Sequence, residues 1–209
     1  MHRVRGTAAA LHGRPWPPPA EPAVWALDVV APALVLGSTQ PAPPGPADPG
    51  VDVARRRSGG GAVLVEPGGL LWVDVAVPAG DPLWDRDVGR AFLWLGDVWV
   101  SALAGAGVAG ATAHRGPLRR SPWSDVACFA GLGPGEVTVA GRKVVGISQR
   151  RSRDVALFQC AALLSWDGPR LAGLLGVPEA AADLATTAAA LPVAREALEP
   201  AFLEALSRV

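Results

Sequence analysis

Three consecutive arginines, Arg55 to Arg57, precede Ser58 and three consecutive glycines, Gly59 to Gly61, and this run constrains the fold more than any other stretch. Successive glycines lose much backbone entropy on folding and bury no side chain, so they destabilise the interior of a helix or strand. They do offer bare backbone N–H groups to an anion, and neighbouring arginines present planar donor forks. A solvent-exposed loop capped by a charge cluster is the alternative without a ligand.

The spacing of this run excludes the two common phosphate-binding loops. No Lys-Ser or Lys-Thr follows the glycines, as a P-loop requires, and the separated glycines of a dinucleotide fingerprint are absent. Apolar residues resume at Ala62 and Val63, so the glycines are expected at the entrance of a strand.

Two stretches resemble lipoate-protein ligases, within the wider group of biotin and lipoate ligases and octanoyltransferases. Arg-Arg-Arg-Ser-Gly-Gly-Gly-Ala-Val at residues 55–63 resembles the lipoyl-binding loop of the family. Gly-Arg-Lys-Val-Val-Gly-Ile-Ser-Gln at residues 141–149 resembles its lysine hairpin, Gly-(Lys/Arg)-Lys-(Val/Ile)-x-Gly-x-x-Gln. Weaker similarities lie at Pro32–Gln40 and at Cys128-Phe129, so the resemblance covers roughly residues 25 to 165.

Length and composition predict a single soluble domain of a size typical of catalytic domains. The chain has 209 residues, half of them apolar, which is enough to bury a sizeable core. A formal net charge of zero argues against a global basic field for nucleic acid or an anionic membrane. The apolar stretch around Ala91 to Ala113 contains Asp97 and several glycines, so it is a poor membrane span. Cys128 and Cys160 lack disulfide or metal spacing, which favours a reducing cytoplasm and no metal site.

The first third of the chain reads as loops and short strands. Residues 1–23 are expected to be a poorly specified segment with a helical turn near residues 8–11, and residues 24–209 to form the catalytic domain. Strands are expected at 23–27 and 33–36, followed by a Pro- and Gly-rich loop at 41–50.

The middle of the chain predicts a hairpin and then a helix. Residues 62–65 and 70–77 are apolar runs separated by Pro67-Gly68-Gly69, so we expect them to pair as a hairpin. Its second strand should place four apolar side chains on one face, namely Leu71, Val73, Val75 and Val77. A helical period begins at Pro82, and the predicted helix ends at Gly105–Gly110, with its tryptophans in the core. Residues 111–125 are expected to be a polar connection with a solvated His114.

A second hairpin is predicted at residues 136–147, with a turn at Ala140-Gly141. Alternation puts Lys143 on the apolar face of Val145 and Ile147. An ammonium there must be paired or lie in a pocket, because burying it unpaired is costly; the alternative is an edge position that reaches water. A strand at 155–165 and C-terminal helices complete an α+β domain, a mixed sheet with helices packed on one side. The resemblance implies the fold of class II aminoacyl-tRNA synthetase and biotin-ligase catalytic domains.

The resemblance implies an enzyme that activates lipoate or octanoate with ATP to acyl-AMP and transfers the acyl group to a lysine of a lipoyl domain. Arg56 would bind phosphate, and Lys143 would contact the acyl carbonyl and the phosphate. The substrate and nucleotide would be bound by one continuous segment, namely Ser58, Gly59, Gly60, Gly61, Ala62, Val63 and Leu64. Mg²⁺ would accompany ATP as a cosubstrate. The acceptors would be lipoyl domains of 2-oxoacid dehydrogenases or the glycine cleavage H protein.

An ATP-independent octanoyltransferase is the second hypothesis. Cys128-Phe129, followed by Glu136 and Lys143, resembles the transferases in which a cysteine thiolate holds the acyl chain as a thioester. Acyl carrier protein would then be a partner. Cys128 as a small buried residue without a chemical role is the alternative.

A divergent, non-catalytic acyl-binding protein is the third hypothesis, because the sequence departs from the ligases at two motifs. Val65-Glu66-Pro67-Gly68-Gly69 replaces the expected His-Asp-x-Gly-Asn, and Cys160-Ala161-Ala162 replaces His-Gly-Thr/Ser. The N-terminal helix is short, and the ligases' accessory domain is expected to be absent. Retention of both Arg56 and Lys143 argues for a working site.

Overall fold

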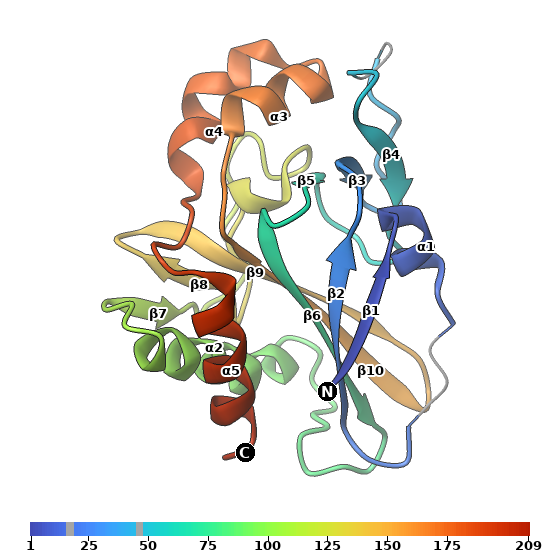
Figure 1. Cartoon of the computed structure of the whole chain (residues 1–209), viewed down its shortest axis with the longest axis vertical. Helices are drawn as coiled ribbons and strands as arrows, with labels where there is room; N and C mark the ends of the chain where they lie inside the picture. The colour runs from blue at the N-terminus through green and yellow to red at the C-terminus, as the bar shows by residue number, and fades with distance from the viewer. Residues whose placement is uncertain (16–18, 45–47) are drawn as a thin grey trace.

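A seven-stranded mixed sheet lies beside a three-stranded sheet in the computed structural model, which describes residues 1–15, 19–44 and 48–209 (Figure 1). The large sheet has the strand order β1-β2-β6-β10-β9-β8-β7, and the small sheet has the order β4-β3-β5. The strands are β1 (His2–Gly6), β2 (Ala23–Val29), β3 (Ala33–Leu36), β4 (Asp52–Arg55), β5 (Val63–Val65), β6 (Leu70–Pro78), β7 (Ala111–Ala113), β8 (Val137–Val139), β9 (Arg142–Arg151) and β10 (Val155–Leu163).

The helices gather mainly in the second half of the chain. They are α1 (Ala8–Gly13), η1 (Arg90–Phe92), α2 (Leu93–Gly105), η2 (Cys128–Ala130), α3 (Gly168–Leu175), η3 (Pro178–Ala180), α4 (Ala181–Thr187) and α5 (Arg195–Leu206). Among the described residues, no helix is long and apolar enough to cross a membrane.

Helices α2 and α5 cover one face of the large sheet. The predicted apolar face of β6 is confirmed, because its odd-numbered residues from Leu71 to Val77 are buried in the core that these helices close. Trp99 of α2 stacks on Phe202 of α5 with 4.3 Å between ring centroids. Trp99 is fully buried, as expected of a core tryptophan. Strand alternation thus accounts for the sheet-facing half of the core.

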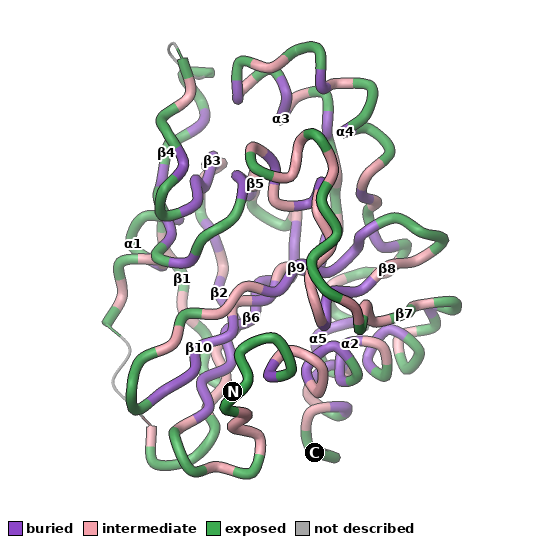
Figure 2. Tube along the Cα trace, turned by 180° about the vertical axis from the view of Figure 1, so that it is seen from behind, coloured by how far each residue is buried: buried purple, intermediate pink, exposed green. Residues whose placement is uncertain are grey.

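The small sheet and α1 cover the opposite face. Their shared core includes Leu11 of α1, Val35 of β3 and Trp72 of β6. Figure 2 shows the buried trace concentrated along the central strands, between these two layers. The α+β fold class predicted from the sequence is therefore confirmed, with a second, small sheet that the sequence did not predict.

The hairpin predicted for residues 62–77 is wrong. β5 pairs antiparallel with β3 in the small sheet, whereas β6 pairs with β2 and β10 in the large sheet. The intervening Pro67-Gly68-Gly69 turn instead passes the chain from one sheet to the other. Two apolar runs around a turn predict a hairpin locally, but pairing with distant strands decides which sheet each run joins.

Other predicted element boundaries also differ from those of the structure. The helix predicted from Pro82 begins only at η1, because the Asp87 carboxylate accepts from the N–H groups of Gly89 (2.8 Å) and Arg90 (3.1 Å) and so fixes a turn before it. The connection expected at residues 111–125 contains β7, which pairs with β8. His114 is half-buried rather than solvated, with its Nε2 2.8 Å from the Pro117 carbonyl.

The N-terminal segment is more ordered than expected. Residues 2–6 form β1, which pairs parallel with β2, and α1 follows with Thr7 as its N-cap. The sequence of β1 is mostly polar and contains only one β-branched residue, Val4, so its composition did not indicate a strand. The predicted loop at 41–50 and the proline cluster at 15–19 lie partly outside the described residues.

The second predicted hairpin is confirmed. β8 and β9 are joined at Ala140 and Gly141, whose φ angles are 49° and 76°. Two successive positive φ angles match the twist of a tight hairpin, and glycine adopts one of them without strain. The last predicted helix is α5, which begins at Arg195; Leu191 precedes it but is buried in the same core.

Candidate acyl-binding site

A narrow cavity of about 50 Å³ lies between the two sheets. Its walls are mostly apolar and include Val35, Val63 and Phe129. The polar side chains on its border come from distant parts of the chain, namely His12, Arg56, Cys128, Ser148 and Gln159. The structure thus brings Arg56 and Cys128, both identified from sequence, to one cavity.

Arg56 folds the glycine run onto itself. Its side chain is 5% exposed, and its Nη2 donates to the carbonyls of Gly59 and Gly61, both at 2.8 Å. Its Nη1 is buried and has no hydrogen-bond partner among the described residues. A buried guanidinium donor without an acceptor is costly, so this atom is suited to an anionic or carbonyl oxygen of a ligand.

The third glycine allows close packing against the segment that carries Cys128. A Cβ atom at Gly61 would lie 2.5 Å from the backbone nitrogen of Ala127. On either side, Ala62 N–H donates to Val126 (2.8 Å) and Cys128 N–H donates to Ala62 (2.8 Å). The glycine run therefore has a packing reason at Gly61 that the sequence alone did not reveal.

The other residues of the predicted binding segment divide into two groups. Among the described residues, the N–H groups of Gly59, Gly60 and Gly61 take part in no hydrogen bond, so they remain available as donors. Ser58 is buried and its hydroxyl lies 3.0 Å from that of Ser148. Ala62 and Leu64 instead face a separate apolar cluster. Within the segment from Ser58 to Leu64, Val63 is the residue that lines the cavity.

Lys143 is buried, but not on the face that alternation predicted. Val145 pairs with Val137 and Lys143 pairs with Thr138, so a bulge in β9 absorbs one residue between these pairs. A bulge of one residue moves a side chain to the opposite face of a sheet. Lys143 therefore faces away from Val145, toward Phe129, with its Nζ 4.9 Å from the ring centroid.

The Lys143 ammonium has three acceptors. Its Nζ donates to the carbonyls of Cys128 (2.9 Å) and Gly131 (3.0 Å) and forms a 2.7 Å ion pair with Glu136. Glu136 in turn accepts from the backbone N–H of Gly133 (2.6 Å) and of Ile147 (3.1 Å). This meets the prediction of a paired lysine, because two carbonyls accept hydrogen bonds from the ammonium and Glu136 balances its charge.

The two cysteines differ in their surroundings. Both cysteines line the cavity, but Cys128 is partly exposed, whereas Cys160 is buried within β10. Burial, with a further contribution from the Asp74 carboxyl, raises the pKa of the Cys160 thiol well above its usual range. Cys128 is therefore the more accessible of the two thiols.

Sequence analysis missed several residues around the cavity. His12 of α1 stacks on Trp72 with 4.5 Å between ring centroids, and burial, followed by the Arg56 charge, lowers the pKa of His12 to about 4. Asp74 is fully buried and accepts from Trp72 Nε1 (2.8 Å) and Gln159 Nε2 (3.2 Å). Burial raises the pKa of Asp74 to about 7. A lone carboxylate inside an apolar strand was the available signal for this network.

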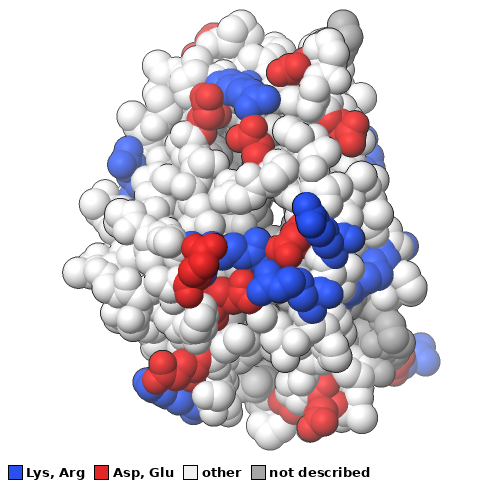
Figure 3. Space-filling model, in the orientation of Figure 1, with Lys and Arg blue, Asp and Glu red and all other residues white. Residues whose placement is uncertain are grey.

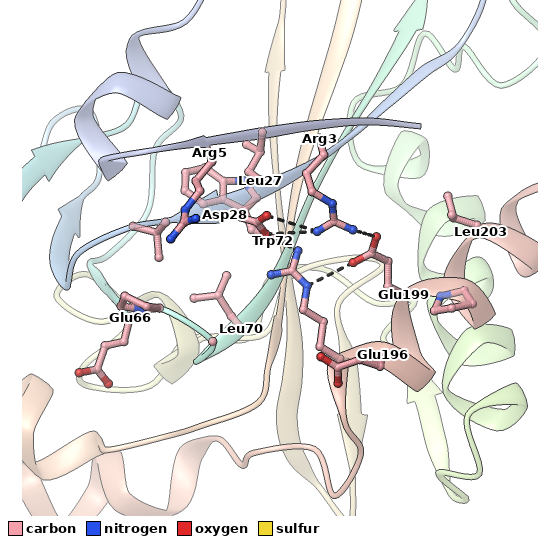
Figure 4. A pocket seen from close by; sticks show the side chains of 15 residues that line it. Arg3, Arg5, Leu27, Asp28, Glu66, Leu70, Trp72, Glu196, Glu199 and Leu203 are labelled. Carbon is pink, nitrogen blue, oxygen red and sulfur yellow. Dashed lines mark hydrogen bonds and ion pairs between the residues drawn. The ribbon is translucent and has the colours of Figure 1, made fainter.

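A second, larger cleft of about 670 Å³ shares Trp72 and Leu70 with the first cavity (Figure 4). Arg3 of β1 and Arg195 of α5 each pair with both Asp28 and Glu199; the Arg195–Asp28 distance is 2.5 Å and the Arg195–Glu199 distance is 3.2 Å. Basic and acidic side chains adjoin across the middle of this face (Figure 3). The charges are largely compensated, so this cleft ties the N-terminal strand to the C-terminal helix rather than forming a phosphate site.

Among the described residues, no group of three or more His, Cys, Asp or Glu side chains is arranged to hold a metal ion.

Comparison with known proteins identifies the family. The family model for the lipoyl protein ligase A/B catalytic domain matches residues 18–197. Octanoyltransferase LipM of Clostridioides difficile is 27% identical over 125 residues, which make up 60% of this chain and 45% of that protein. The aligned region thus spans less than half of that relative.

Solved structures show the same fold. The bipartite lipoate protein ligase of Thermoplasma acidophilum, studied with its E2 lipoyl domain, has a TM-score of 0.70 at 18% identity, covering 100% of this chain and 83% of that chain. A lipoate-protein ligase A bound with ATP has a TM-score of 0.66 at 17% identity, covering 100% and 85%. LipL1 of P. falciparum in complex with lipoate has a TM-score of 0.58 at 16% identity, covering 90% and 47%. Because the family model matches most of the chain, the chain belongs to the lipoyl protein ligase A/B catalytic-domain family.

Proposed function

We propose that this protein transfers an octanoyl or lipoyl group to a lysine of a lipoyl domain, with Cys128 carrying the acyl group as a thioester. Two neighbouring features of the site together support this proposal. Cys128 borders the apolar cavity, and the neighbouring Lys143 ammonium is already held by the carbonyls of Cys128 and Gly131 and by its ion pair with Glu136. The octanoyltransferase among the relatives supports the same choice.

The reaction has two steps. The Cys128 thiolate attacks the carbonyl carbon of an acyl thioester, the C–S bond of the donor breaks, and the donor thiol leaves with a proton. The unprotonated amine of the acceptor lysine then attacks the Cys128 thioester, an amide forms, and the Cys128 thiol is regenerated. The glycine N–H groups and Arg56 Nη1 are free to donate to the oxyanion of each step. Neither step consumes ATP.

Acyl carrier protein suits the donor role, because it presents an acyl thioester. The acceptors would be lipoyl domains of 2-oxoacid dehydrogenases or the glycine cleavage H protein. Both cysteines are free thiols, which suits a reducing compartment, and we infer a cytoplasmic location.

The ATP-dependent ligase reaction is the second candidate function. It is favoured by Arg56 Nη1 and by the three glycine N–H groups, which together would donate to the α-phosphate of ATP. In that reaction Lys143 would exchange part of its contact with Glu136 for the acyl-adenylate. Mg²⁺ would enter with the nucleotide.

Two assays separate the candidates. Purified protein is incubated with octanoyl-acyl carrier protein without ATP and analysed by intact mass spectrometry, and ATP–pyrophosphate exchange is measured with lipoate or octanoate. The proposal predicts one octanoyl adduct that Cys128→Ser abolishes, and no exchange. Exchange without an adduct would instead establish the ligase. Acyl binding with neither activity would leave a non-catalytic homologue.

A further inference from the structure

Strand register lays two rows of side chains across the sheet face beneath the cavity. Gly146 of β9, Ala161 of β10 and Trp72 of β6 are directly paired and form the first row. The second row consists, in the same strand order, of Ser148, Gln159 and Asp74. It lies two residues further along each strand, which is about 7 Å away.

The reacting end of the cavity lies at the first row. A Cβ atom at Gly146 would be 3.1 Å from the Phe129 ring, and Phe129 directly follows Cys128. The cavity then extends over the first row toward Gln159. Because the lining includes Cys128 as well as Ser148 and Gln159, an acyl chain attached to Cys128 and laid over the first row would meet the second row.

The second row is polar and already hydrogen bonded. The Gln159 amide donates to both Asp74 oxygens, at 3.2 and 3.5 Å, and Asp74 also accepts from Trp72 at 2.8 Å. Asp74 has no exposed surface. A longer apolar chain would have to displace Gln159 and break bonds that the buried Asp74 cannot replace with water.

We propose that Gln159, held in place by Asp74, closes the far end of the cavity and sets the length of the acyl chain that the protein accepts. The inference rests on the proposed function in one respect, namely that the cavity holds the acyl chain. It assigns the choice of chain length to β10 rather than to the glycine loop.

The test measures binding rather than turnover. Saturated fatty acids from hexanoate to dodecanoate displace a fluorescent fatty acid from wild-type protein and from Gln159→Ala. The shortened side chain makes room for about two more methylene groups, each contributing about 0.8 kcal/mol of burial. The affinity ratio of decanoate to octanoate should therefore rise by up to about fifteenfold.

A matched control removes the same side chain from the other face of the sheet. Gln149 of β9 pairs with Phe158 and faces the α2 side, so Gln149→Ala should leave the decanoate-to-octanoate ratio unchanged. Gln159→Ser, which retains a donor for Asp74, serves as the second variant if Gln159→Ala does not fold, with a smaller shift in the same direction expected.

The outcomes distinguish this inference from the proposed function. An unchanged ratio in folded Gln159→Ala and Gln159→Ser, an equal change in Gln149→Ala, or no fatty-acid binding to wild-type protein would each overturn the inference. A shifted decanoate-to-octanoate ratio in protein that forms no Cys128 adduct would support the chain-length role of Gln159. It would contradict only the proposed transferase reaction.

Discussion

The Lys143 ammonium donates a 2.9 Å hydrogen bond to the backbone carbonyl of Cys128. This bond joins the lysine hairpin to η2, the short helix that begins at Cys128, and the cation also lies over the ring of Phe129. Lys143 therefore positions the Cys128 segment through its main chain, while Glu136 balances its charge. The lysine hairpin thus meets the Cys128-Phe129 stretch, which showed a weaker similarity to the family, at this contact.

Replacing Lys143 alone should destabilise the protein and also slow the acylation of Cys128. Lys143→Ala leaves the Glu136 carboxylate buried without its counter-ion, and breaking a buried pair in this way costs about 3–5 kcal/mol. Urea denaturation of the variant measures the loss.

The double variant Lys143→Met/Glu136→Gln separates stability from function. Removing both charges should restore most of the free energy of unfolding, while Cys128 acylation stays slow because the Cys128 carbonyl has lost its donor. Full acylation rates in the double variant would contradict a positioning role for Lys143.

Gly61→Ala and Gly59→Ala form a matched pair within the glycine run. A methyl group at Gly61 would collide with the backbone of Val126 and Ala127, so we expect a loss of about 1–3 kcal/mol. A methyl group at Gly59 meets no atom within 4 Å, so the effect should stay within about 0.5 kcal/mol. Thermal denaturation compares the two, and equal losses would refute the packing role of Gly61.

Asp74 should make the protein less stable as the pH rises. Its pKa is raised from 3.8 to about 7 in the folded state, so between these values the folded state binds the additional proton. The stabilisation is fully present below pH 3.8 and is lost as the pH rises through about 7. The contribution of His12 to stability depends on pH in the opposite direction, because burial lowers its pKa from 6.5 to about 4. That contribution is present above pH 6.5 and is lost as the pH falls through about 4.

Asp74→Asn isolates the Asp74 contribution. An asparagine accepts from Trp72 without titrating, so the stability of this variant relative to wild type should increase from pH 4 to pH 7. Denaturation curves measured across that range test this expectation. Curves that stay parallel for the two proteins would show that Asp74 does not titrate there.

Glu199 should contribute to stability by anchoring the N-terminal strand. It is 8% exposed and pairs with Arg3 of β1 and Arg195 of α5. Glu199→Ala should lower the free energy of unfolding by about 1–3 kcal/mol. Glu196→Ala, an exposed change one turn away, should alter it by less than about 0.5 kcal/mol. Chemical denaturation of both variants decides whether the ion pairs matter.

Features with local causes were predictable from the sequence. The β8–β9 hairpin follows from the Ala140-Gly141 turn, and the helix-covered face of β6 follows from strict alternation. The family motifs located Arg56, Cys128 and Lys143, and all three lie at or beside one cavity. Whether each performs the role that the family implies remains a prediction.

Features that depend on distant pairing were not predictable. β5 and β6 look like one hairpin in sequence, but their partners place them in different sheets. The bulge that turns Lys143 away from Val145 is a register shift of one residue, which alternation cannot reveal. Gln159 and His12 reach the cavity from β10 and α1, and neither belongs to a recognised motif.

Acyl transfer to an acceptor tests the central claim most directly. Wild-type protein and Cys128→Ser are incubated with octanoyl-acyl carrier protein and an unmodified lipoyl domain in the absence of ATP, and the mass of the lipoyl domain is followed. The account predicts one octanoyl group on the acceptor lysine with wild-type protein and none with Cys128→Ser. Equal transfer by the two proteins, or transfer by wild type only after ATP and free octanoate are supplied, would contradict it.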